Sequence, residues 1–208
     1  MTANLITLFR LLLLFFIFFI VARGGLQGHI WGMFLTVFMI ALDGIDGVIA
    51  RWLKETSEFG GVFDIVVDRI VENCFWIYFA AKGIIPLWIP FVVLSRGFFT
   101  DGIRSVALSK GMTAFGDTSL QKSTLGKTLV SSKWSRGLYG FSKIAAFLSL
   151  IVLHGLTLQE TGPMLTENVR NAIRLSGNFI VYFTVAFCIV RAIPVVLDSR
   201  SFLFRAKN

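Results

Sequence analysis

Long apolar stretches constrain this chain more than any other feature of its sequence. Each is about 20 residues long, the length that a helix needs to cross a bilayer's hydrocarbon core. Of the 208 residues, 55% are hydrophobic and 15% are charged, whereas about 25% are charged in a typical soluble domain. The sequence therefore predicts an all-α integral membrane protein with six transmembrane helices, over 5–22, 30–52, 62–81, 84–108, 137–156 and 173–197.

Basic residues are distributed unevenly between the loops that join these stretches. The 109–136 connection carries five of them against the single carboxylate of Asp117: Lys110, Lys122, Lys127, Lys133 and Arg136. Because loops rich in Lys and Arg stay on the cytoplasmic side, both termini are predicted to be cytoplasmic. The net charge of +8 on so apolar a chain favours anionic lipid headgroups as a partner over nucleic acid. No small-residue cleavage site follows the first stretch, so we expect it to be retained as a span.

Four carboxylates lie where consecutive spans meet the cytoplasmic side. Asp43 and Asp46 are three residues apart near the end of the second stretch, and Asp64 and Asp68 are four residues apart in the third. Residues at these spacings share one face of a helix. The polar segment 52–59 between the two pairs reads as a turn, so the spans run antiparallel and the four carboxylates should converge near the cytoplasmic surface.

Carboxylates gathered in a membrane need neutralisation, because each costs roughly 2.5–3.5 kcal/mol near the bilayer centre. Protonation, as in a proton relay, is one solution, and a divalent cation is another. Oxygen ligands without nearby His or Cys favour Mg²⁺, Mn²⁺ or Ca²⁺, and four carboxylates suit a pair of ions able to clamp a phosphoryl group. The nearby glycines, such as Gly47 and Gly60, permit either close helix packing or the approach of a ligand.

These residues follow the signature D-x-x-D-G-x-x-A-R-x8-G-x3-D-x3-D, and the chain thereby resembles the CDP-alcohol phosphotransferase family. The pattern runs over 43–68 with every fixed position and gap in agreement: Asp43, Asp46, Gly47, Ala50, Arg51, Gly60, Asp64 and Asp68. The resemblance implies one domain over 1–208, with six membrane helices around a cytoplasm-facing polar cavity. It also implies transfer of a phosphatidyl group from a CDP-linked donor, such as CDP-diacylglycerol, to an alcohol, with release of CMP.

The same resemblance implies roles for individual residues. The four aspartates, Asp43, Asp46, Asp64 and Asp68, would hold two divalent ions, Mg²⁺ or Mn²⁺, and Asp68 would also take the proton of the acceptor hydroxyl. Gly47, Ala50 and Gly60 would leave room for the cytidine nucleotide, and Arg51 would contact its phosphates or base. No Ser or Cys nucleophile with an adjacent His is visible in the sequence, so direct displacement fits better than a covalent intermediate.

Cationic side chains within the spans help to predict which alcohol is the acceptor. Arg96, Arg104 and Lys143 lie within apolar spans, where each alone would more often snorkel to the interface. Arg191, in an otherwise apolar span, should face the bundle interior or snorkel to the near interface. Taken together, they favour a phosphorylated acceptor. The opening residues NLITLFRLLL resemble those of bacterial phosphatidylglycerophosphate synthases, which favours glycerol 3-phosphate. Arg69 after the last motif aspartate, where those enzymes often have Lys, is closer to the branch that uses inositol phosphate, which is the nearest rival.

Two further classes of protein also explain buried carboxylates. An ion-coupled transporter would bind its cation at membrane aspartates, and a membrane scaffold would use a polar cluster to join helices. Neither accounts for Arg51, Gly60 and the fixed spacing of the motif. Small residues on several spans make a homodimer an expected assembly.

Overall fold

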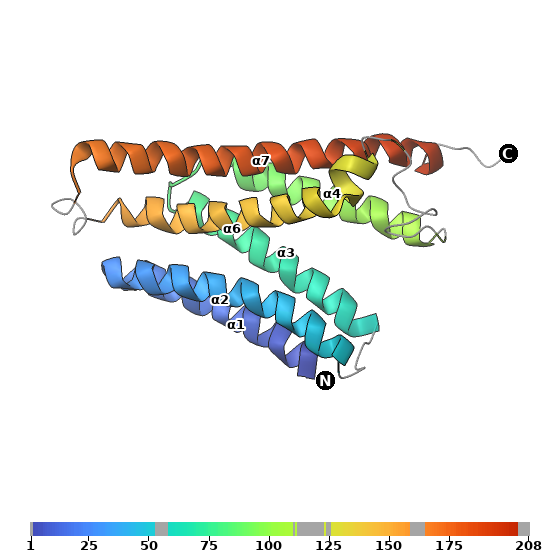
Figure 1. Ribbon diagram of the computed structural model, residues 1–208, viewed down its shortest axis with the longest axis horizontal. Coiled ribbons are helices and arrows are strands. Elements are labelled where there is room, and N and C mark those ends of the chain that lie inside the picture. Colours follow the sequence, from blue (N-terminus) through green and yellow to red (C-terminus); the bar gives the residue numbers. More distant parts are fainter. Residues whose placement is uncertain are drawn as a thin grey trace. The chain divides into compact units, whose positions relative to one another are not determined.

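The computed structural model describes residues 2–52, 58–109, 111, 123, 126–158 and 165–203, and within these it describes the side chains of 4–44, 60–109, 111, 123, 126, 128–158 and 165–200. All regular elements in this part of the chain are helical (Figure 1). They are α1 (Thr2–Arg23), α2 (Gly25–Trp52), α3 (Glu58–Ala81), α4 (Trp88–Ser109), the short π-helix η1 (Lys127–Ser131), α6 (Lys133–Gly155) and α7 (Glu167–Leu203). The predicted all-α class is confirmed.

Four of these helices are long and apolar enough to cross a membrane: the segments Asn4–Arg23, Gly25–Gly44, Lys133–Gly155 and Glu167–Arg200. The helices α3 and α4 have 24 and 22 residues, and both carry more charge. Every 18-residue stretch of α3 includes Asp64, Asp68, Arg69 and Glu72, and α4 carries Arg96, Asp101 and Arg104. The helices of a membrane protein are therefore present, and the count of six spans stays a prediction.

The chain forms two compact units. Unit 1 consists of Met1–Leu87 and Ile144–Val181, and unit 2 consists of Trp88–Lys143 and Tyr182–Asn208. Helix α1 packs against both α2 and α3 in unit 1. An aromatic core stabilises this unit, with Phe75 stacked on Phe147 at a centroid distance of 4.4 Å and Phe18 stacked on Tyr78 at 4.4 Å.

The hairpin between α1 and α2 is tight because glycines line it. A Cβ atom added at Gly28 would lie 2.3 Å from the carbonyl oxygen of Ile20, and one added at Gly24 would lie 2.7 Å from the same oxygen. The backbones approach more closely than any side chain would allow. The second helix consequently begins at Gly25, five residues before the predicted span.

Helix α4 begins at Trp88 and not at the predicted residue 84. Gly83 has φ +73° and its N–H donates to the carbonyl of Ala80, while the N–H of Ile84 donates to Phe79. This pair of hydrogen bonds is a Schellman motif, which ends α3 at a left-handed glycine. The apolar residues that follow, including Pro86, form a turn, because hydropathy alone does not reveal a helix stop.

Candidate carboxylate and cation site

Three of the four predicted carboxylates come together in unit 1 around the guanidinium of Arg10. Its Nη2 lies 2.7 Å from Oδ1 of Asp43 and 2.8 Å from Oδ1 of Asp68, and its Nη1 lies 3.1 Å from Oδ1 of Asp64. We call Asp43, Asp64 and Asp68 the carboxylate triad. Its members come from α2 and α3, and Arg10 comes from α1.

Residue spacing within one helix explains why Asp64 and Asp68 lie together. Asp64 and Asp68 are one helical turn apart on α3, so their side chains share a face. Asp43 and Arg10 join them only because α1 packs against both α2 and α3. The predicted convergence is therefore confirmed for the triad. The side chains of Asp46, Gly47, Ala50 and Arg51 lie outside the described residues, although their backbone belongs to α2. Gly60, also part of the motif, is in the first turn of α3.

Sequence reasoning missed Arg10, which the structure places at the centre of this site. The residue stands in an otherwise apolar stretch, NLITLFRLLLL. An ionisable residue within a membrane helix usually faces the protein interior and pairs with an opposite charge. That rule pointed to a buried partner for Arg10, but only the fold identifies the three carboxylates.

The triad has the composition and spacing of a site for a hard divalent cation. One oxygen from each carboxylate can be chosen so that all three lie within 4.8 Å of one another. Because each Mg–O distance is only about 2.1 Å, the three oxygens would have to move closer together to share one such ion. The presence of a guanidinium among these oxygens shows that the cluster requires positive charge. The residues therefore fit a divalent cation.

A second charged group lies in unit 2 around the ring of Tyr139. The Cζ atom of Arg191 lies 5.2 Å from the ring centroid, Nζ of Lys143 lies at 5.2 Å and Cζ of Arg96 lies at 5.8 Å. We call Arg96, Lys143 and Arg191 the basic cluster. Cation–π contacts of this kind hold like charges close together, each contributing about 0.5–1 kcal/mol or more.

Arg191 is the most buried member of the basic cluster, at 7% exposed. Its Nη1 donates to the carbonyl of Leu129 at 2.6 Å and to Oγ of Ser135. These partners are neutral, and among the described residues no carboxylate pairs with Arg191. Of the two alternatives that the sequence leaves open for Arg191, the structure shows the side chain facing the protein interior. Its charge is left available to an anion.

The remaining predicted acceptor residue, Arg104, is in a different situation. It is close enough to Arg191 to interact electrostatically, but its Nη1 lies 3.7 Å from Oδ1 of Asp101 on the same helix. Its side chain is 44% exposed, so water screens much of its charge. Arg104 is therefore at the edge of the basic cluster.

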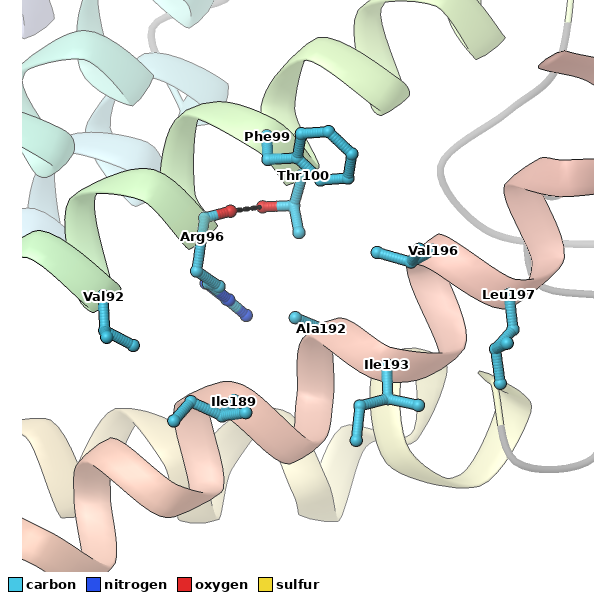
Figure 2. A pocket seen from close by; sticks show the side chains of 9 residues that line it. All are labelled: Val92, Arg96, Phe99, Thr100, Ile189, Ala192, Ile193, Val196 and Leu197. Atoms are coloured by element: carbon cyan, nitrogen blue, oxygen red, sulfur yellow. Dashed lines mark hydrogen bonds between the residues drawn. The ribbon is translucent and has the colours of Figure 1, made fainter.

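An apolar groove of about 360 Å³ runs between α4 and α7 in unit 2. Figure 2 shows the side chain of Arg96 directed into it from α4, with residues of α7 on the opposite wall. We call this the α4–α7 groove; besides Arg96 it is lined by Val92, Phe99, Thr100, Ile189, Ala192, Ile193, Val196 and Leu197. The groove thus combines an apolar wall with one cation.

The two histidines do not belong to either charged site. In unit 1 the Nε2 atom of His29 lies 2.8 Å from Nδ1 of His154. His29 is 14 residues before Asp43 on α2, a separation of about 21 Å along the helix axis. Both histidines are therefore remote from the carboxylates, and neither can act as a base at the triad.

Comparison with known proteins adds independent information. A family model described as CDP-alcohol phosphatidyltransferase matches residues 1–193. A Mycobacterium tuberculosis protein provisionally named cardiolipin synthase is 31% identical over 119 residues, covering 57% of this chain and 56% of that protein. A Drosophila melanogaster protein provisionally named cardiolipin synthase (CMP-forming) is 26% identical over 196 residues, or 83% of this chain and 58% of that protein.

A bacterial relative carries a different name. The Bacillus subtilis CDP-diacylglycerol–glycerol-3-phosphate 3-phosphatidyltransferase is 29% identical over 83 residues, which cover 40% of this chain and 43% of that enzyme. The chain thus spans about half the length of the curated relatives that it matches.

Proposed function

Because the chain belongs to the CDP-alcohol phosphatidyltransferase family, we propose that it transfers a phosphatidyl group from CDP-diacylglycerol to an alcohol and releases CMP. The observation that carries this proposal is the carboxylate triad, in which three motif residues from two helices gather within 4.8 Å. Such a reaction belongs to phospholipid biosynthesis. The oxygen of the alcohol attacks the phosphorus that bears the diacylglycerol, and the bond from that phosphorus to the CMP oxygen breaks.

The residues proposed to hold two divalent ions are Asp43, Asp46, Asp64 and Asp68. When bound, Mg²⁺ or Mn²⁺ supplies positive charge that offsets the diphosphate and stabilises the departing CMP. Among the described residues the triad contributes three carboxylates, each 38–48% exposed, so an ion can reach them from water.

Asp68 is proposed as the general base. Its side chain is 48% exposed, against 38% for Asp43 and 40% for Asp64, so it is the triad member most accessible to an incoming alcohol. A carboxylate oxygen of Asp68 would accept the hydroxyl proton as the new O–P bond forms. Proton removal makes the attacking oxygen a better nucleophile and needs no covalent enzyme intermediate.

The cytidine nucleotide is proposed to lie against the small residues of the motif, Gly47, Ala50 and Gly60. Their lack of bulk would let the nucleotide approach the helix backbones. Arg51 would contact the nucleotide's phosphates or base, since a guanidinium presents a fork of donors to a phosphate. These assignments follow the family motif.

The acceptor is proposed to be anionic, with glycerol 3-phosphate favoured and inositol phosphate as the rival. The basic cluster supports this choice because, among the described residues, the hydrogen-bond partners of the Arg191 guanidinium are all neutral. A phosphate group would supply the missing negative charge. The name of the Bacillus subtilis relative includes glycerol 3-phosphate.

A second candidate is an acceptor that is itself an anionic glycerophospholipid. The α4–α7 groove favours it, because an acyl chain matches the apolar wall and a phosphodiester matches Arg96 (Figure 2). The names of the Mycobacterium tuberculosis and Drosophila relatives, which both refer to cardiolipin synthase, agree with such an acceptor.

Four apolar helices and family membership make the chain an integral membrane protein. We extend this to six spans that enclose a cavity open to the cytoplasm, with both termini on that side. Support comes from the basic residues of the 109–136 connection. Single cysteines introduced at Lys133 and Lys82 should react with an impermeant maleimide from opposite sides of the membrane. The homodimer expected from small residues stays a prediction.

One assay tests the proposed reaction. Purified protein in mixed micelles receives CDP-diacylglycerol labelled in its phosphatidyl group and Mg²⁺, together with glycerol 3-phosphate, inositol phosphate or phosphatidylglycerol in separate reactions. We expect CMP release and a labelled lipid product that depend on one of these alcohols and that disappear with EDTA. CMP release with none of the acceptors would contradict the proposal, as would ion movement across sealed vesicles without nucleotide consumption, which is expected of a transporter.

A further inference from the structure

Arg10 and the carboxylate triad differ sharply in exposure. The side chain of Arg10 is 3% exposed, whereas the three carboxylates that it contacts are 38–48% exposed. The guanidinium therefore meets the carboxylates from the protein interior, while part of each carboxylate remains open to solvent. A divalent cation that arrived from water would reach the triad without first displacing the buried guanidinium.

The contacts of Arg10 have the geometry of a clamp. Its two terminal nitrogens reach three carboxylates on two different helices, and in each case the contacted atom is Oδ1. A carboxylate has two oxygens that can accept hydrogen bonds or bind a metal. The contact with Arg10 fixes the orientation of each carboxylate through one of them.

Repulsion between the carboxylates explains why such a clamp is needed. Three carboxylates within 4.8 Å of one another repel, and their side chains would separate without a cation among them. The planar guanidinium is always charged and presents its donors in a fixed fork. It therefore holds the carboxylates close together whether or not a metal ion is bound.

We propose that Arg10 is a positioning residue that clamps Asp43, Asp64 and Asp68 from the buried side and so preorganises them to bind a divalent cation. The inference rests on the metal-binding role given to these aspartates under the proposed function. Groups that orient metal ligands from behind typically contribute 10- to 100-fold to metal affinity. The opposite possibility is that Arg10 competes with the metal for the same oxygens.

Binding of Mn²⁺, measured by the loss of the free Mn²⁺ electron paramagnetic resonance signal, separates the two possibilities. The full chain in detergent is titrated without donor or acceptor, as wild type, Arg10→Met and Arg10→Lys. Arg23→Met is the matched control, since Arg23 is also an arginine of α1 but lies exposed over the ring of Phe19 at 5.2 Å.

We expect Arg10→Met to weaken Mn²⁺ binding 10- to 100-fold. Arg10→Lys should weaken it less than 10-fold, because an ammonium keeps the charge and loses the fork, and Arg23→Met should stay within twofold of wild type. Affinity in Arg10→Met that is unchanged or tighter would overturn the inference, and tighter binding would identify Arg10 as a competitor. If Arg10→Met does not fold, as judged by size exclusion and circular dichroism, Arg10→Lys decides: weaker binding supports the clamp, and unchanged or tighter binding overturns it.

Thermal unfolding provides a second readout. A purely structural role would lower the unfolding midpoint equally with and without Mn²⁺ and leave Mn²⁺ affinity unchanged, and that result would also overturn the inference. Neither the Mn²⁺ titration nor thermal unfolding depends on catalysis. Wild-type protein that binds Mn²⁺ but releases no CMP would contradict the proposed function and leave the inference about Arg10 standing, whereas wild-type protein that binds no Mn²⁺ would overturn the inference.

Discussion

The carboxylate triad and the basic cluster both concentrate charge within apolar helices, but they neutralise it differently. In the triad three negative groups share one buried cation, Arg10, through ion pairs of 2.7–3.1 Å. In the basic cluster three cations surround the ring of Tyr139, and Arg191 is held by the carbonyl of Leu129 and the hydroxyl of Ser135.

This difference indicates what each cluster can bind. The triad gathers three carboxylates around one guanidinium, so it favours an added cation. Among the described residues, Arg191 of the basic cluster gains only weak compensation from an aromatic face and neutral oxygens, so it favours an added anion. The proposed reaction, between a diphosphate and a phosphorylated alcohol with divalent cations, would use both preferences. Four substitutions test the comparison.

The largest effect is expected from Asp68→Asn. An amide cannot accept the hydroxyl proton as a carboxylate does, and general-base catalysis contributes typically 10²- to 10⁴-fold. We expect CMP release to fall at least 10²-fold, with unchanged circular dichroism. Glu167→Gln, at an exposed position in the first turn of α7, is the control and should retain wild-type activity. Wild-type turnover in Asp68→Asn would remove Asp68 as the base.

The next largest effect is expected from Arg191→Met, which removes the most buried charge of the basic cluster. A hydrogen bond to a charged group contributes about 1.5–3 kcal/mol, so we expect the KM for the acceptor to rise about 10- to 100-fold and the KM for CDP-diacylglycerol to change less than threefold. Steady-state kinetics with each substrate varied in turn measures both. Equal increases would show that Arg191 supports the fold around Leu129 and does not bind the acceptor.

A smaller effect is expected from Tyr139→Leu, which removes the ring and leaves the three cations in place. Because each cation–π contact contributes about 0.5–1 kcal/mol, we expect the acceptor KM to rise about threefold to tenfold. Tyr139→Phe is the matched control, since it keeps the ring and loses only the hydroxyl, and it should stay within twofold of wild type. An equal effect of both variants would assign the role to the hydroxyl instead.

The smallest effect is expected from Arg104→Gln, at the edge of the basic cluster. Its side chain is 44% exposed and paired with Asp101, and exposed ion pairs contribute little. We expect the acceptor KM to change less than threefold, as in the control Arg174→Gln at an exposed position of α7. A tenfold increase confined to Arg104→Gln would place it inside the acceptor site.

Much of the candidate site could be predicted from residue spacing. Asp64 and Asp68 must share a face of α3 because they are four residues apart, and the motif that includes Asp43 requires the end of α2 to be near the start of α3. The start of α4 was harder to predict than the carboxylates. The Schellman motif at Gly83 depends on backbone conformation, and the residues on both sides of it are apolar, so hydropathy does not reveal the helix stop.

The sequence by itself determined that the chain is helical, that its helices are apolar enough for a membrane, and that Asp64 and Asp68 share a helix face, because helical periodicity and transfer free energy are local properties of the chain. Only the tertiary structure decided which cations join them. Arg10 is 33 residues from Asp43 and 58 from Asp68, and Tyr139 is 52 residues from Arg191. Contacts at such separations arise when helices pack, and no periodicity within one helix specifies them.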